Sequence, residues 1–313
     1  MDYTTLGRTG LQVSVLGLGG GGHSRLGQQT GNTREQSVAL VQRALDLGIN
    51  FIDTAEAYGT EAIIGQALHG RKREDVVLST KKTIRQQGTL VTAADVQCGS
   101  EDSLARLKVD YVDVYHLHAV QSEDYEYVRE QLVPVLEQLQ AQGKIRFLGL
   151  TEKFAADTRH QMLKRAVPDD NFDVVMVGFN ILNQSARERV LAHTRRQNIG
   201  VLDMFAVRQA FSQIIKLREI LADLIKEGSL DPDSVDEESP LGFLVHPMGA
   251  RSLVDAAYRF CRGETGVHVV LSGTGSQHHL EENVASILRP PLPPSDRQRL
   301  VEIFARVDSV SGQ

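Results

Sequence analysis

The chain has 313 residues with a formal net charge of -6, and 41% of its residues are hydrophobic. This size suits one large α/β domain, and the mixing of acidic and basic residues leaves no basic stripe for nucleic acid. No apolar run is long enough to span a membrane, no signal peptide is visible, and two distant cysteines, Cys98 and Cys261, fit a cytoplasmic protein without a disulfide framework.

The first 50 residues predict a hairpin, a strand and a helix. Residues 3–16 alternate apolar and polar side chains on either side of a turn at Gly7–Gly10, which is typical of a hairpin. Val15–Gly19 is expected to be the first core strand. A helix follows, with Thr33 as its N-cap and Gly48 as its stop signal.

Strands and helices then alternate to the C-terminus, with one irregular unit at residues 208–250 that contains a helix at Ile214–Ile225. The remaining strands are predicted at Asn50–Asp53, Val76–Thr80, Tyr111–His118, Ile145–Leu150, Val174–Phe179, Gly200–Phe205 and His268–Leu271. The helices are predicted at Glu61–Leu68, Ala93–Leu107, Tyr125–Gln142, Ala155–Arg165, Ser185–Gln197, Ser252–Arg262, Gln277–Leu288 and about 294–307. Eight apolar strands, each followed by helix, favour a (β/α)8 barrel formed by a single domain, residues 1–313, with the hairpin closing its bottom.

A glycine-rich run, Gly17–Gly22, formally matches the G-x-G-x-x-G motif of dinucleotide-binding folds. That motif must open directly into a helix, because the helix N-terminus holds the pyrophosphate. The residues that follow, His23–Asn32, are polar and rich in Gly and Gln, so no helix starts there and we reject this interpretation. The glycines instead predict a loop whose backbone lies close to a flat ligand.

Ionisable side chains follow three neighbouring strands of the predicted barrel. Asp53 ends the second strand, Lys81 follows the third, and His118 ends the fourth, while Tyr58 stands in the loop after Asp53. The carboxyl ends of barrel strands carry the catalytic groups. We therefore expect these four side chains to converge.

Their chemistry follows from acid strength. A phenol with an ordinary pKa near 10 is a poor proton donor at neutral pH, and a nearby ammonium lowers that pKa. Lys81 can do this to Tyr58, Asp53 can hold Lys81 charged, since a buried ammonium needs a partner, and neutral His118 can donate to a substrate oxygen. The set predicts a proton donor for a carbonyl that receives a hydride.

Simpler interpretations exist for each residue. Asp53 could cap the next helix, Tyr58 could be a surface residue and His118 a packed core histidine. Lys82 is expected to be a solvated neighbour of Lys81. His116 shares a strand face with His118, and such a pair can bind metal in a hydrolase barrel, but no further ligand is evident beyond Asp53, so we expect no metal site.

At this point the chain resembles the aldo-keto reductases, and the resemblance covers essentially its whole length. It is carried by six segments: Leu6–Ser14, Gly48–Gly59, Ser79–Lys81, Leu104–His118, Gly143–Gly149 and Gly273–Asn283. The second contains Asp53 and Tyr58, the third ends in the catalytic lysine, and the fourth ends in the catalytic histidine. The resemblance therefore assigns the histidine role to His118 and not to His116.

The resemblance implies reduction of a small-molecule carbonyl, or oxidation of an alcohol, with NADP or NAD and without a Rossmann fold. The cofactor would lie extended across the top of the barrel. Its implied contacts are Gly20, Gly21, Asp53, Thr151, Glu152, Met176, Phe205, Ala206, Val207, Arg208, Gly273, Thr274, Gly275, Ser276, His279, Glu282 and Asn283. Of these, Glu282 and Asn283 would face the adenine, residues 273–276 would wrap the adenosine phosphate side, and the 205–208 loop would cover the pyrophosphate.

The chain departs from the family where the nicotinamide would bind. The usual Ser-Asn after the fifth strand reads Thr151-Glu152, and the usual Gln of the sixth strand reads Met176. Glu152 is still expected to accept from the amide NH2, whereas Met176 only packs. Residues 205–207, where the family usually has Ser-Pro-Leu, are Phe-Ala-Val in this chain. Because the usual stacking residue is replaced, Phe179 is expected to form the wall against the nicotinamide ring.

At the adenosine end, His279 replaces the arginine that often binds the 2′-phosphate. A neutral histidine is a weaker phosphate ligand than arginine, so the preference between NADP and NAD stays open. The altered contacts also leave a second function open, a nucleotide-binding sensor or partner module like the potassium-channel β-subunits of the family. The substrate and the oligomeric state are not readable from the sequence.

Overall fold

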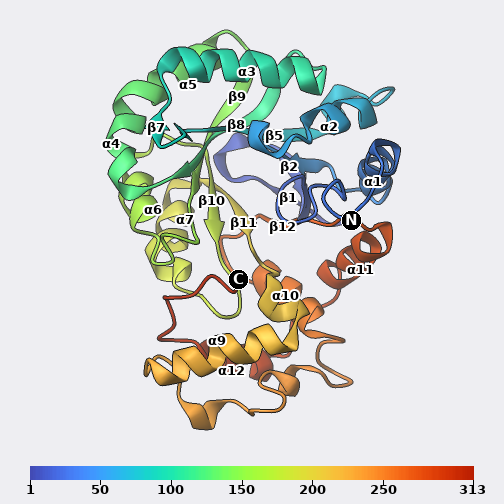
Figure 1. The fold of residues 1–313 in the computed structure, drawn as a ribbon, viewed down its shortest axis with the longest axis vertical. Helices are drawn as coiled ribbons and strands as arrows, with labels where there is room; N and C mark the ends of the chain where they lie inside the picture. Colours follow the sequence, from blue (N-terminus) through green and yellow to red (C-terminus); the bar gives the residue numbers. More distant parts are fainter.

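A computed structural model describes all 313 residues, and its centre is a closed barrel of eight parallel strands (Figure 1). Around the barrel the strands follow their order in the chain, and β12 pairs with β3 to close it. The strands are β3 (Leu16–Gly19), β4 (Phe51–Asp53), β5 (Val77–Thr83), β8 (Val112–Val120), β9 (Ile145–Glu152), β10 (Val174–Gly178), β11 (Gly200–Met204) and β12 (Val269–Ser272). The predicted (β/α)8 barrel is confirmed.

Helices surround the barrel and cover its outer face (Figure 1). They are α1 (Arg34–Asp46), α2 (Glu61–Ala67), α3 (Ala93–Leu107), α4 (Tyr125–Tyr127), α5 (Val133–Ala141), α6 (Gln161–Ala166), α7 (Ala192–Gln197), α10 (Leu253–Arg262) and α11 (Gln277–Ile287). A π-helical segment, Val128–Leu132, joins α4 to α5. The irregular unit forms α8 (Gln209–Ser212) and α9 (Ile214–Lys226), and α12 spans Pro294–Ile303. Figure 1 shows α9 and α12 together at one end of the molecule.

The N-terminal hairpin closes the bottom of the barrel as predicted. Strand β1 (Tyr3–Thr5) pairs antiparallel with β2 (Gln12–Ser14). The short helix at Gly7–Thr9 lies against the start of β11, where a Cβ on Gly7 would come within 2.4 Å of the Gly200 backbone nitrogen. Gly7 also has a φ of +49°, so both the contact and the backbone require glycine.

Alternate residues of each strand fill the barrel interior. One buried apolar cluster contains Phe51, Val77, Val114 and Met176, which come from four different strands. Because side chains alternate with a period of two, Asp53, Ser79 and His116 point to the same interior, one layer nearer the carboxyl ends. The sequence therefore places its ionisable groups directly above an apolar floor.

The structure corrects three local predictions. The helix predicted at Ala155–Arg165 begins only at Gln161, because His160 has a left-handed backbone and Asp157 caps the helix by accepting from two of its backbone N–H groups. The last helix ends at Ile303, four residues early. An unpredicted hairpin of β6 (Arg85–Gln86) and β7 (Thr89–Leu90) follows β5.

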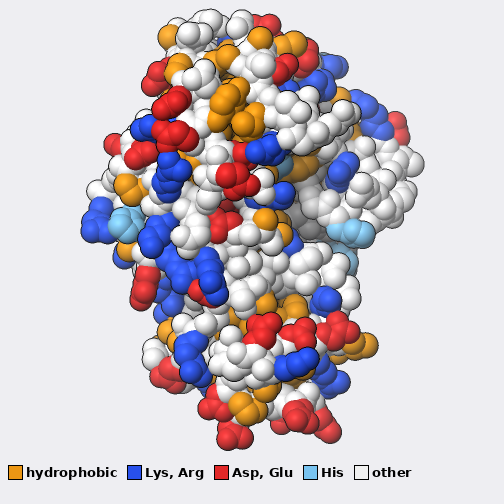
Figure 2. Space-filling view, turned by 60° about the vertical axis from the view of Figure 1, so that its left-hand side comes forward, with side chains coloured by type: hydrophobic (Ala, Val, Ile, Leu, Met, Phe, Trp, Pro, Cys, Tyr) orange, Lys and Arg blue, Asp and Glu red, His pale blue; other side chains and the backbone are white.

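Both cysteines are free, and none of the helices has the length and apolar character needed to cross a membrane. Figure 2 shows acidic and basic side chains interspersed on the face that it draws. That distribution agrees with the mixed charge of the sequence.

Candidate active site

An ion pair between Asp53 and Lys81 lies at the carboxyl end of the barrel. Lys81 Nζ is 2.5 Å from Asp53 Oδ2, and the two side chains are 0% and 5% exposed. The ammonium also donates to the Thr54 carbonyl at 2.6 Å, and the Ser79 hydroxyl donates to Asp53 Oδ1 at 2.7 Å. Asp53 caps no helix, because Thr60 precedes α2. Its carboxylate instead holds the lysine in place, as predicted from the residue types.

Tyr58 and His118 face each other above this pair. The Tyr58 hydroxyl is 3.3 Å from His118 Nε2, and the two rings meet edge to face. Lys81 Nζ lies 5.2 Å from the centre of the Tyr58 ring. Thr83 Oγ1 is 3.5 Å from His118 Nδ1. The structure thus brings together all four residues that the sequence singled out for proton transfer.

Burial dominates the acid strength of these groups. It lowers the pKa of His118 to about 3, with a smaller contribution from Lys81, so this imidazole is neutral at pH 7. Burial also raises the pKa of Tyr58, and Lys81 opposes the rise without cancelling it. The expectation of a lowered phenol pKa is therefore wrong for the protein alone, although the effect of Lys81 has the predicted sign. Burial likewise raises the pKa of Asp53, against Lys81.

Lys82 and His116, which lie next to these residues, are both buried among other protein groups. Lys82 is buried and forms an ion pair with Glu56 at 3.0 Å, so the prediction of a solvated side chain is wrong. His116 is fully buried against Gly149, where a Cβ would come within 2.3 Å of the imidazole, and its ring nitrogens have no partner. No group of three or more His, Cys, Asp or Glu side chains is placed to hold a metal ion.

Glycines of the loop after β3 are needed for its close packing against Tyr58 and Thr60. A Cβ on Gly21 would come within 2.5 Å of the Tyr58 ring, and one on Gly20 within 2.9 Å of Thr60 Oγ1. The Gly20 N–H donates to the Asp53 carbonyl at 2.6 Å. The backbone of this loop lies close to Tyr58, and its approach to a flat ligand stays a prediction.

Thr151 and Glu152 point to opposite sides of β9. The Thr151 hydroxyl accepts from the Ala119 N–H at 2.8 Å, directly beside His118. Glu152 points outward and is fully buried, with its carboxylate 2.9 Å from His160 Nδ1 and accepting from the Gly178 N–H at 2.8 Å. All of these partners are protein groups. The expectation that Glu152 reaches the nicotinamide amide does not fit this geometry.

The aromatic wall is also built differently from the prediction. Phe179 is fully buried outside the barrel, stacked on Phe260 at 5.7 Å, so it does not line the mouth. Phe154 lies there instead, covering Gly178, where a Cβ would come within 2.3 Å of its ring. It stacks on Phe205 with ring centroids 6.2 Å apart. Phe205 is among the cofactor contacts that the resemblance implies, and it stands where the family usually has a serine.

Arg208 carries a positive charge without an acidic partner. Its guanidinium lies 3.8 Å from the centre of the Phe205 ring, its Nε has no hydrogen-bond partner, and burial lowers its pKa to about 10. It remains charged at pH 7. A partly buried cation of this kind favours an anionic ligand, which fits the predicted pyrophosphate position. Ala206 is buried beside it and Val207 is half-buried.

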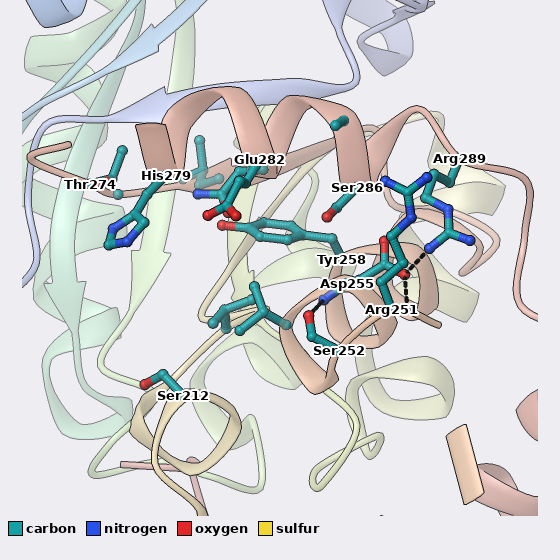
Figure 3. A pocket seen from close by; sticks show the side chains of 16 residues that line it. Ser212, Arg251, Ser252, Asp255, Tyr258, Thr274, His279, Glu282, Ser286 and Arg289 are labelled. Carbon is teal, nitrogen blue, oxygen red and sulfur yellow. Dashed lines mark hydrogen bonds and ion pairs between the residues drawn. The ribbon is translucent and has the colours of Figure 1, made fainter. Parts of the chain in front are cut away.

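A cavity of about 490 Å³ lies between α10, α11 and the loops after β11 and β12 (Figure 3). It brings together many of the predicted cofactor contacts. These are Val207, Gly273, Thr274, His279, Glu282 and Asn283. Gly275 and Ser276, the remaining residues of the 273–276 loop, do not line the cavity, and Ser276 caps α11. Met176 is buried in the barrel floor, and Asp53, Tyr58, Lys81 and His118 do not line the cavity.

The glycine loop and the predicted cofactor loop are joined above the barrel. Asn32 Nδ2 donates to the Gly275 carbonyl at 2.7 Å. A Cβ on Gly275 would come within 2.5 Å of the Gly27 Cα. The loop after β3 therefore contacts both Tyr58 and the 273–276 loop, two of whose residues, Gly273 and Thr274, line the cavity.

The sequence model of the Aldo/keto reductase family matches residues 16–305. The chain belongs to this family. An L-galactose dehydrogenase of Arabidopsis thaliana is 28% identical over 321 residues, which cover 99% of this chain and 95% of the plant protein. Aldo-keto reductase YhdN of Bacillus subtilis (strain 168) is 32% identical over 212 residues, 64% of this chain and 61% of YhdN.

A solved relative supports the same assignment for this aldo-keto reductase. The holo form of aldo-keto reductase AKR11C1 from Bacillus halodurans superimposes with a TM-score of 0.74 at 25% identity, covering 99% of this chain and 97% of that protein. Family membership makes this chain an enzyme, an NAD(P)-dependent oxidoreductase.

Proposed function

We propose that this aldo-keto reductase reduces a small-molecule aldehyde or ketone with NADPH or NADH, or catalyses the reverse oxidation, and that Tyr58 is the proton donor. One observation carries the proposal: the Tyr58 hydroxyl lies 3.3 Å from neutral His118 and beside the buried Lys81–Asp53 pair. A phenol, an imidazole donor and a fixed ammonium in one group match the needs of a carbonyl that gains charge on its oxygen.

Each residue has a distinct part in the reduction. Bound NAD(P)H supplies the hydride that adds to the carbonyl carbon, and the carbonyl oxygen takes its proton from Tyr58. His118 is neutral, so it can donate an Nε2 hydrogen to that oxygen and fix its angle. Lys81 stabilises the phenolate that remains, and Asp53 holds the lysine in position.

The protonation state of Tyr58 favours the direction of reduction. Because burial raises its pKa, the phenol keeps its proton at neutral pH when the site is unliganded. That is the form required to protonate an alkoxide. In the oxidation of an alcohol the phenolate must form first, and Lys81 is the group that lowers the free energy of that state.

The cofactor is proposed to extend from the catalytic residues to the 490 Å³ cavity. Arg208 and the 273–276 loop would hold the pyrophosphate and the adenosine phosphate side, and Glu282 and Asn283 would face the adenine. Asn283 is fixed by donating to Ser272 Oγ at 2.9 Å, and Glu282 is exposed. Since Glu152 and Phe179 are turned away, Thr151, Phe154 and Phe205 are the groups left near the nicotinamide.

Steady-state kinetics with Tyr58→Phe tests the proposal. Oxidation of NADPH and NADH is followed at 340 nm with a panel of aldehydes and ketones, and the reverse reaction with alcohols and aldoses, including L-galactose because a 28% identical relative bears that name. Loss of the phenol proton should lower kcat about 10²–10⁴-fold while the dissociation constant for the cofactor is kept.

Tyr3→Phe is the matched control, because Tyr3 carries an exposed phenol in the hairpin at the opposite end of the barrel, where it donates to the Gly48 carbonyl. It should turn over like the wild type. Wild-type turnover by Tyr58→Phe would contradict the assigned role of Tyr58. Tight binding of the cofactor by the wild type with no turnover of any substrate would contradict the proposed reaction.

A further inference from the structure

Strand β5 presents polar side chains on both of its faces near its carboxyl end. Lys81 points into the barrel, where its ammonium pairs with Asp53. Because side chains alternate with a period of two, Thr80 and Lys82 point to the outer face of the barrel. Both are buried there, and a buried polar group needs a partner. The reduction proposed above uses Lys81 and gives these two side chains no part.

The partners of Thr80 and Lys82 lie at the two ends of the segment that carries Tyr58. Lys82 Nζ donates to Glu56 Oε2 at 3.0 Å, and Thr80 Oγ1 donates to Glu61 Oε1 at 2.6 Å. Glu56 begins the short helix that ends at Tyr58, and Glu61 is the first residue of α2. The outer face of β5 therefore holds both ends of this segment, while its inner face carries the ammonium that lies beside the phenol.

The ion pair between Lys82 and Glu56 is enclosed by α3. The two side chains are only 7% and 17% exposed. A Cβ on Gly99 of α3 would come within 2.8 Å of Lys82 Nζ and within 3.1 Å of Glu56 Oε2. Glycine in the middle of a helix lowers its stability relative to alanine. At this position it leaves the space that the ion pair fills.

The short helix has few other polar side-chain contacts that could fix its position. Its N-cap, Ala55, forms no side-chain hydrogen bond, and Ala57 is exposed. Glu56 and Tyr58 are the helix residues whose side chains form hydrogen bonds, and that of Tyr58 is with His118. Loss of the ion pair would therefore leave the helix with the reacting phenol as its own polar side-chain anchor.

We propose that Lys82 is a positioning residue for the proton donor, and that it acts through Glu56 to fix the Tyr58 phenol relative to Lys81 and His118. The proposal rests on the proposed function, since it takes Tyr58 as the proton donor. A displacement of about 1 Å at a reacting group can cost about 10²-fold in rate. Because Lys82 lies on the outer face of the barrel, its loss should act on kcat and not on cofactor binding.

Steady-state kinetics with benzaldehyde as the probe, and with the better bound of NADPH and NADH, tests this role in Lys82→Met. This substitution keeps the aliphatic volume and removes the ammonium. It should lower kcat about 10- to 100-fold and leave the calorimetric dissociation constant of the cofactor within about 2-fold. In the Tyr58→Phe background it should cause no further loss, because its effect passes through the phenol. Lys144→Met is the matched control, since Lys144 pairs with Glu101 at the amino end of β9, and it should turn over like the wild type.

Hydrogen exchange of the unliganded protein provides a measurement that does not depend on turnover. Lys82→Met should raise amide exchange in residues 54–61, whereas Lys144→Met should not. Gly99→Ala crowds the ion pair without removing a charge and favours the helical state of α3. It should also raise exchange in residues 54–61 and lower kcat, and it provides the same test if Lys82→Met does not fold.

The outcomes separate this inference from the proposed function. Wild-type kcat in Lys82→Met, exchange in residues 54–61 no faster than in the wild type, or a further loss of kcat in the Tyr58→Phe background each overturns the inference. The proposed function stands in all three cases. Wild-type turnover by Tyr58→Phe contradicts the proposed function itself.

Discussion

Replacing Asp53 by asparagine removes the charge that faces the fully buried Lys81 ammonium. The Thr54 carbonyl then remains as its acceptor, and Ser79 can still donate to the asparagine oxygen. At 2.5 Å the charge–charge attraction is about 7 kcal/mol with an effective dielectric constant of about 20. Removing one partner of a buried pair costs about 3–5 kcal/mol, because the other charge is left uncompensated. We expect Asp53→Asn to lose that much unfolding free energy.

A double-mutant cycle separates this effect from the loss of packing. Lys81→Met keeps the aliphatic volume of the lysine and removes its charge, and Asp53→Asn combined with Lys81→Met removes both charges. The double variant should therefore be more stable than the sum of the two single losses by about 3 kcal/mol or more.

The assay is urea unfolding followed by far-UV circular dichroism, because the chain has no tryptophan for fluorescence. A loss below about 1 kcal/mol in Asp53→Asn, or additive losses in the double variant, would falsify the view that the pair is tightly coupled and poorly hydrated. In that case Lys81 would need another explanation for its orientation toward Tyr58.

Two further predictions concern His118 and Glu152. Because burial holds the pKa of His118 at about 3 rather than 6.5, the unfolded chain binds a proton that the folded chain excludes between these values, and stability falls as the pH drops through this window. From pH 7 to pH 5 the wild type should therefore lose more unfolding free energy than His118→Asn, by at most about 1.4 kcal/mol per pH unit, and parallel stability curves would refute this. Glu152→Ala should cost about 2–4 kcal/mol in urea unfolding, because it leaves His160 and the Gly178 N–H without their acceptor. Its calorimetric dissociation constant for the cofactor should stay unchanged, and a large loss of affinity with little loss of stability would return Glu152 to the nicotinamide site.

The convergence of the four residues proposed to be catalytic could be predicted, because their positions depend on strand ends. Asp53, Lys81 and His118 each follow a short apolar run that can only be a buried strand, and the carboxyl ends of such strands meet at one end of the barrel. The register between strands was not needed for this prediction. Their convergence follows from topology alone.

The residues expected around the nicotinamide, Glu152 and Phe179, could not be placed in the same way. For them, the face of the strand on which the side chain lies decides what it contacts. Gly149 and Thr151 point inward, so Glu152 points outward to His160. Met176 is buried in the barrel floor, which turns Phe179 outward to Phe260. Applying the period of two from these inward residues would have corrected both assignments.

The pairing of β12 with β3 has a consequence for the order of folding. Leu16 and Val270 are partners in the register although nearly the whole chain separates them. During synthesis Asp53, Tyr58, Lys81 and His118 emerge long before this partner strand. Until β12 arrives, β3 has an open edge of unpaired backbone groups next to the apolar barrel floor. Closure of the barrel is therefore a late, long-range step, and substitutions in β12 should slow refolding and promote aggregation of the unclosed barrel.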